Sequence, residues 1–60
     1  MTIVLIDSPK DFRRHIEHDA LFPDVGDTIK TGPLSEFLVE VRILNYDAKT
    51  VTCLGQFNQV

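Results

Sequence analysis

The stretch Ser35-Glu-Phe-Leu-Val-Glu-Val-Arg-Ile-Leu-Asn45 decides the fold of this 60-residue chain. Its apolar residues recur with a period of two, which is the pattern of a β-strand. Turn-forming residues follow at positions 46–49, and residues 50–57 return as a second strand. The two segments predict a long antiparallel hairpin in which Gly55 marks a β-bulge.

Both faces of this hairpin are apolar. The first face carries Phe37, Val39, Val41, Ile43, Val51, Cys53 and Phe57. The second face carries Leu38, Leu44, Tyr46 and Leu54. Soluble monomers seldom leave a contiguous apolar patch of several hundred Å² in water. Either the sheet curls over both faces, or the second face binds another chain, and we expect a partner-binding surface there.

The chain before the hairpin predicts a strand and a helix. Residues 3–6 are apolar on both faces, which is typical of a short central strand. Ser8 suits a helix N-cap, Pro9 the first helical position and Asp11 the first turn. We expect a helix from Pro9 to about Asp19 or Ala20. Its narrow apolar stripe consists of Phe12, Ile16 and Ala20.

Between this helix and the hairpin, the sequence predicts one further strand. Pro23 ends the helix, and residues 24–27 read as a turn in which Gly26 adopts a positive φ. A strand containing Thr28 and Ile29 follows, and residues 31–33 form a second turn. The predicted fold of residues 1–60 is therefore a single α+β domain. One N-terminal helix packs on a curled antiparallel sheet of about four strands, either a meander or an SH3-like small barrel.

Composition indicates a small globular protein that gains stability by self-association. The chain is 43% apolar, and its net charge is −3. A domain of this size buries only about 60% of its unfolded surface, so small domains depend on disulfides, metals or oligomerisation. Cys53 is the only cysteine, which excludes an intrachain disulfide. We expect a homodimer or higher homo-oligomer.

The free thiol and the short apolar N-terminus favour a cytoplasmic location and argue against a membrane span.

The residues with chemical potential do not form a recognisable catalytic or metal motif. His15 and His18 would be neighbours on a helix and could hold zinc only if a symmetric dimer completed the ligand set. Cys53 lies mid-strand on an apolar face, which favours packing over nucleophilic chemistry. We therefore expect no cofactor, no metal and no enzymatic activity.

Two groups of charged residues are candidate binding sites. Lys10, Arg13 and Arg14 would gather near the helix start and, with Arg42, could bind an anion. A solvated helix face is the alternative interpretation, and we prefer it. The acidic segment from Glu17 to Asp27 lacks Lys and Arg. It is interpreted either as a solvated loop or as a partner-binding edge containing Phe22 and Asp24.

The segments Pro23-Asp-Val-Gly-Asp-Thr-Ile29, Phe37-Leu-Val-Glu-Val41 and Thr50-Val-Thr-Cys-Leu54 resemble short SH3-like β-barrel accessory proteins of bacteria and phages. The resemblance covers the last two thirds of the chain. Taken with the small size and acidic charge, it suggests a non-enzymatic protein that binds and modulates or inhibits a partner protein. By analogy of size and style, this includes phage-encoded inhibitors of a host defence or host enzyme, which would act in the host cytoplasm.

Two other functions remain open from sequence. The first is a homo-oligomer that binds or sequesters a small anionic nucleotide, with basic residues at the rim of an interface pocket. The second is a small barrel that binds nucleic acid, against which the net negative charge counts.

Overall fold

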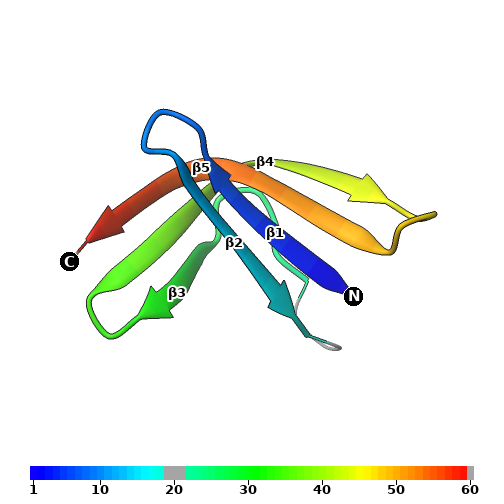
Figure 1. Cartoon of the computed structure of the whole chain (residues 1–60), viewed down its shortest axis with the longest axis horizontal. Coiled ribbons are helices and arrows are strands. Elements are labelled where there is room, and N and C mark those ends of the chain that lie inside the picture. Colours follow the sequence, from blue (N-terminus) through cyan, green and yellow to red (C-terminus); the bar gives the residue numbers. More distant parts are fainter. Residues whose placement is uncertain (19–21, 60) are drawn as a thin grey trace.

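Five strands form one curled, mixed sheet in the computed structural model, which describes residues 1–18 and 22–59 (Figure 1). The strands are β1 (Thr2–Asp7), β2 (Phe12–Glu17), β3 (Thr28–Gly32), β4 (Ser35–Asn45) and β5 (Thr50–Gln59). Their spatial order is β2-β1-β5-β4-β3. β1 pairs with β5 in parallel, and the other three pairs are antiparallel.

The predicted α+β fold is wrong, because the segment expected to be a helix is a strand. Residues 12–17 form β2 and pair antiparallel with β1, where Ile16 lies opposite Ile3. Residues 8–11 make the connecting turn, in which the Asp11 N–H donates to the Ser8 carbonyl over 3.1 Å. Asp11 has φ 53°, a left-handed conformation that aspartate tolerates better than most residues. The predicted helix end at Asp19 or Ala20 lies outside the described residues.

Backbone hydrogen bonding explains why the strand replaces the helix. β1 lies inside the sheet, and both of its edges present N–H and C=O groups that need partners. β5 supplies partners along one edge and β2 along the other. Phe12 and Ile16, four residues apart, share one face of a strand as readily as one face of a helix. The spacing of Phe12 and Ile16 is therefore as compatible with a strand of a hairpin as with a helix.

The long hairpin predicted from residues 35–45 is confirmed, and it contains a bulge. β4 covers Ser35–Asn45, and β5 extends to Gln59. Val39 lies opposite Gly55 and Val41 opposite Leu54, so Glu40 is the extra residue. A Cβ on Gly55 would lie 1.8 Å from the carbonyl oxygen of Leu38, which only glycine avoids. The bulge therefore forms beside Gly55, as the sequence indicated, with the inserted residue on the opposite strand.

The bulge reverses which β4 side chains face the core. A one-residue shift moves every following side chain to the other face of the sheet. Phe37 and Val39 are fully buried, whereas Val41 is 48% exposed and Ile43 is 50% exposed. The predicted single face running from Phe37 to Ile43 is therefore wrong beyond Glu40. Arg42 and Leu44 take the inner positions, opposite Cys53 and Val51.

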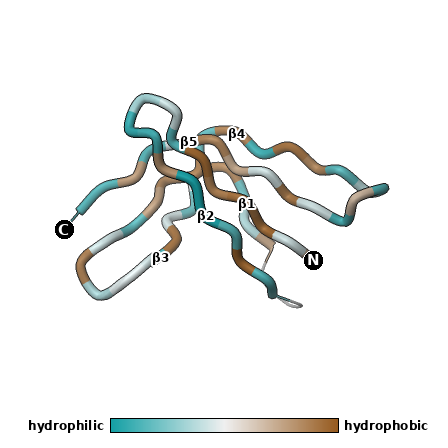
Figure 2. The backbone as a smooth tube through the Cα atoms, in the orientation of Figure 1, coloured by the Kyte–Doolittle hydropathy of each residue, from teal (hydrophilic) through white to brown (hydrophobic). Residues whose placement is uncertain are grey.

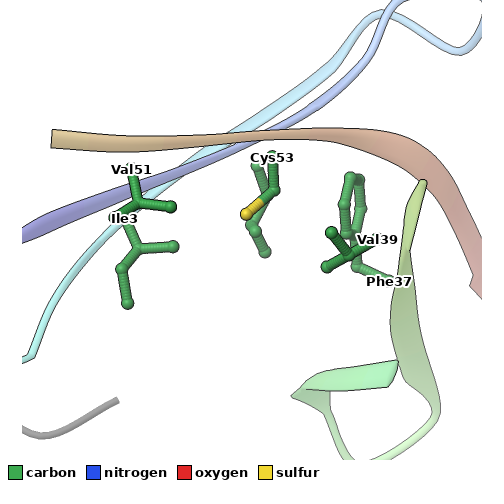
Figure 3. Packing of buried hydrophobic residues seen from close by; sticks show 6 residues of the cluster. Ile3, Phe37, Val39, Val51 and Cys53 are labelled. Atoms are coloured by element: carbon green, nitrogen blue, oxygen red, sulfur yellow. The ribbon is translucent and has the colours of Figure 1, made fainter. Parts of the chain in front are cut away.

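The core fills the inner face of the curled sheet. Its buried residues come from β1, β4 and β5, and Figure 3 shows Cys53 lying between the Ile3–Val51 pair and the Phe37–Val39 pair. The full buried cluster is Ile3, Leu5, Phe37, Val39, Val51 and Cys53. Figure 2 shows the matching apolar run along β1 and the polar turn that follows it.

Side chains, not a backbone ladder, join the two outer strands β2 and β3. The Arg14 side chain leaves β2 on the inner face and donates from Nη1 to the Thr31 carbonyl of β3 over 2.7 Å. A second contact reaches from β2 to β5, where the Phe12 ring stacks on the Phe57 ring with 4.1 Å between centroids. These contacts hold the sheet in its half-barrel curl. No helix in the described residues is long and apolar enough to cross a membrane.

A buried carboxylate fastens the β1–β2 turn to the end of β5. Asp7 is 3% exposed, and its two oxygens accept from the Phe57 N–H over 2.8 Å and the Lys10 N–H over 3.3 Å. The Lys10 ammonium in turn donates to the Phe57 carbonyl and to Asn58 Oδ1. In the sequence Asp7 directly follows the apolar run 3–6, and this position gives no sign of its buried role.

Candidate partner-binding surface

The outer face of the sheet carries a contiguous set of apolar residues, here called the outer patch. It consists of Val4, Ile6, Leu38, Val41, Ile43 and Leu54. The strand register arranges five of them in two rows across the middle of the sheet. Ile6, Leu54 and Val41 lie side by side across β1, β5 and β4. The next row places Val4 and Ile43 on either side of Thr52.

The outer patch is most exposed on β4. Val41 and Ile43 are each about half exposed, whereas Val4 is buried between its neighbours. The described residues contain no helix that would lie over this face. β-branched side chains held on a rigid sheet lose little further entropy on binding, since their χ1 is already restricted.

Polar groups of both signs surround the outer patch. Arg13 lies opposite Ile6 and His15 opposite Val4, both on β2. On the β4 side, the Gln56 amide donates to a Glu40 carboxylate oxygen over 3.1 Å. An apolar centre with a polar rim is the composition of protein–protein interfaces.

The four hairpin residues predicted to bind a partner do not lie on one face of the sheet. Leu38 and Leu54 belong to the outer patch. Leu44 lies on the inner face opposite Val51, and Tyr46 is 83% exposed in the hairpin turn. Val41 and Ile43 were not expected on this face, because an unbroken alternation through residues 37–43 places them with Phe37 and Val39. Gly55 was the signal for a bulge, but it did not show that the extra residue lies on β4.

Phe22 and Asp24, the other two predicted partner-binding residues, contact Arg42 instead of the outer patch. The Arg42 guanidinium lies 5.0 Å from the centroid of the Phe22 ring and 3.8 Å from Asp24 Oδ1. Arg42 Nη1 also donates to the carbonyl of the buried Pro23 over 3.1 Å. These contacts pin the loop before β3 against the inner side of the sheet, so a structural role accounts for them.

The four candidate anion-binding residues do not come together. Without a helix start, Lys10 lies in the β1–β2 turn and Arg13 on the outer face. Arg14 and Arg42 both project from the inner face. Lys10, Arg14 and Arg42 each donate to a backbone carbonyl of the chain itself. The geometry thus gives no support to a shared anion site.

The sheet separates the candidate nucleophile from the candidate base. Cys53 is fully buried on the inner face, whereas His15 is exposed on the outer face. His18 follows β2, and its N–H donates to the Met1 carbonyl over 3.2 Å. Over residues 1–18 and 22–59, no three His, Cys, Asp or Glu side chains lie close enough to hold a metal ion.

Burial raises the pKa of the Cys53 thiol above 9.0, because desolvation disfavours the thiolate; the nearby Arg42 charge opposes this in part. At alkaline pH the unfolded thiol ionises first, so the unfolded state binds fewer protons than the folded one. We expect the free energy of unfolding to fall as pH rises through the unfolded pKa, by at most about 1.4 kcal/mol per pH unit. Urea titrations of wild type and Cys53→Ala between pH 7 and 10 should show this additional decline only in the wild type. Equal declines in the free energy of unfolding of the two proteins would contradict the raised pKa of Cys53.

Comparison of the chain with protein-family models, curated proteins and solved structures gave no match.

Proposed function

We propose that this chain is a non-enzymatic interaction protein that binds a partner protein through the outer patch and thereby modulates or inhibits it. The observation that carries the proposal is the outward placement of Val41 and Ile43 by the Glu40 bulge. Without that bulge, both side chains would face the core side of β4. Holding two β-branched apolar side chains in water costs stability. We therefore interpret the bulge that exposes them as part of a binding surface.

The register supports one continuous binding surface. Leu54 lies between Ile6 and Val41, so a partner can cover three strands with one apolar contact. Burying a valine or isoleucine that is half exposed contributes on the order of 1 kcal/mol, and several such residues together give a usable binding free energy. Anchors of this kind dominate interface energetics, and the surrounding polar groups mainly exclude water.

The rim defines the chemistry of the partner. Arg13 is exposed beside Ile6. Glu40 on the opposite side is already bonded to Gln56. A matching surface would have an apolar centre and an acidic group facing Arg13. Charge complementarity at such a rim sets orientation and the association rate more than affinity.

A photo-crosslinking amino acid at position 43 tests this proposal in cells of the native host. We expect it to link one protein species that a crosslinker at position 47, in the exposed hairpin turn, does not link. The linked protein is then purified, and its affinity for the wild-type chain is measured by calorimetry.

Ile43→Lys and Leu54→Lys should each weaken that affinity at least about 10-fold, which corresponds to 1.4 kcal/mol. Asp47→Lys, which makes the same kind of change in the turn, should leave it unaltered. The melting temperature of all three variants should stay near that of the wild type. Wild-type affinity in both outer-patch variants would refute the proposal.

A further inference from the structure

β4 has a stretch of open backbone edge. β3 pairs only with the first part of β4, from Ser35 to Leu38. The Val39 backbone adds two hydrogen bonds, to the Asp27 carbonyl and the Gly26 N–H. From Val41 to Asn45, β4 pairs with β5 on one side, and from Glu40 to Asn45 no backbone of the described residues pairs with its other side. Figure 1 shows this half of the β4–β5 hairpin extending beyond β3.

The other two edges of the sheet are more fully protected against strand addition than this one. β2 carries Arg13, Arg14, His15 and Glu17 in six residues, and β3 is five residues long. Charged side chains and short strands are the usual protection of exposed edges. Residues 40–45 contain no proline or lysine, and their protection is limited to the Glu40 bulge and to the inward Arg42, whose charge Asp24 and the Pro23 carbonyl already hold. Apolar side chains flank the edge on both faces. Val41 and Ile43 lie on the outer side, and the 36% exposed Leu44 lies on the inner side.

We propose that the open edge of β4, residues 40–45, pairs antiparallel with the same segment of a second copy of this chain. The result is a two-fold symmetric homodimer with one continuous sheet. The occupant of the edge must be an extended strand with apolar side chains on both faces, and residues 40–45 are themselves such a strand. The segment holds one acid, Glu40, and one base, Arg42, so two copies do not repel each other by net charge.

The side chains select one register for this pairing. An axis through Ile43 places Ile43 opposite its symmetry mate, Arg42 opposite Leu44 and Val41 opposite Asn45, so it uses the open edge from residue 41 to residue 45. An axis through Arg42 would set two guanidinium groups against each other, which is unfavourable. An axis through Val41 would require the edge at Val39, which already bonds to Gly26 and Asp27. The Ile43 register also joins the two outer patches into one larger surface.

Edge pairing of this size predicts a weak dimer. The interface consists of one strand pair and a few side chains, which places it at the low end of protein interface areas. We expect a dissociation constant on the order of micromolar to tens of micromolar. The wild-type chain should therefore change from monomer to dimer between about 1 μM and 1 mM in sedimentation equilibrium.

Backbone N-methylation tests the edge without altering any side chain, and a 60-residue chain is accessible to chemical synthesis. Consecutive amides of a strand point to opposite edges, so of the Ile43 and Leu44 amides one faces β5 and the other faces the open edge. N-methylation of the outward amide should leave the melting temperature of the monomer unchanged and abolish the dimer. N-methylation of the inward amide should destabilise the fold. The melting temperature therefore identifies which of the two amides faces β5.

Leu54→Lys separates this edge contact from contact between outer faces. Leu54 lies on β5, away from the open edge, so the variant should dimerise like the wild type while losing affinity for the partner protein. In the wild type, hydrogen exchange at alternate amides of residues 40–45 should slow as protein concentration rises. A wild type that stays monomeric at about 1 mM, exchange independent of concentration, an outward N-methyl chain that still dimerises, or loss of the dimer in Leu54→Lys would each overturn the proposal.

Discussion

Replacing Gly55 with alanine should unfold the protein. The new Cβ would lie 1.8 Å from the carbonyl oxygen of Leu38 and 3.2 Å from the backbone nitrogen of Glu40. Both contacts are with backbone, so relief requires β4 and β5 to separate at the bulge. That separation would also loosen Val39 and Cys53 in the core. We expect a loss of about 4 kcal/mol, which is comparable to the whole stability of a domain this small.

Gly32→Ala is the matched control for this prediction. A Cβ there would meet only the Ser35 hydroxyl oxygen, at 2.9 Å, and a side chain can rotate away. Circular dichroism should show a cooperative melt for Gly32→Ala close to that of the wild type, and little or no folded signal for Gly55→Ala. A cooperative melt of Gly55→Ala within a few degrees of the wild type would show that the strands do not approach each other this closely.

Asp7→Ala should cost about 3 kcal/mol in the free energy of unfolding. The change removes the acceptor for the Phe57 N–H and for the Lys10 N–H. Hydrogen bonds to a charged acceptor contribute about 1.5–3 kcal/mol each, and a part-buried amide left without an acceptor adds to the loss. The end of β5 would then lose its connection to the β1–β2 turn, and the Phe12–Phe57 stack would loosen with it.

Urea denaturation of three aspartate variants tests the role of Asp7. Asp7→Asn keeps one side-chain oxygen as an acceptor, so its loss should be smaller than that of Asp7→Ala. Asp47→Ala removes an exposed carboxylate in the hairpin turn and should change stability by less than about 0.5 kcal/mol. If Asp7→Ala and Asp47→Ala proved equally stable, the buried carboxylate would have no structural role.

The hairpin could be predicted because its signals are local. Alternation along residues 35–45 and turn residues at 46–49 lie within one stretch of chain, and β4 has the predicted bounds. The burial of Cys53 is likewise confirmed. Gly55 indicated the bulge, but alternation alone does not show on which strand the extra residue lies. That one-residue difference decides whether Val41 and Ile43 belong to the core or to the surface.

The first hairpin could not be predicted because its signals fit two structures. Ser8 and Asp11 are favoured in turns as well as at helix starts, and Phe12 and Ile16 suit either element. The choice depends on β1, whose two edges both need partners. The parallel pairing of β1 with β5 joins segments almost 50 residues apart, as in Ile3 with Val51. No local pattern in the sequence records such a pairing.

The candidate site shows the same division between local and long-range information. Leu38 and Leu54 could be placed on an outer face from alternation, and both belong to the outer patch. The contacts of Phe22 and Asp24 with Arg42 could not be predicted, because they depend on how the loop returns to the sheet. The basic residues Lys10, Arg13 and Arg14 were grouped on a predicted helix. Because this segment forms a turn and a strand instead, their side chains point in different directions.

The outward direction of Ile43 underlies both the partner-binding surface and the dimer, and thiol labelling measures it directly. Ile43→Cys and Val39→Cys are each made with Cys53 retained as a buried internal reference. At low protein concentration, we expect the thiol at position 43 to react with Ellman's reagent at close to the rate of a free cysteine. The thiol at position 39 should stay as protected as Cys53. Equal protection at positions 39 and 43 would mean that β4 alternates without a bulge, and the outer patch on β4 would not exist.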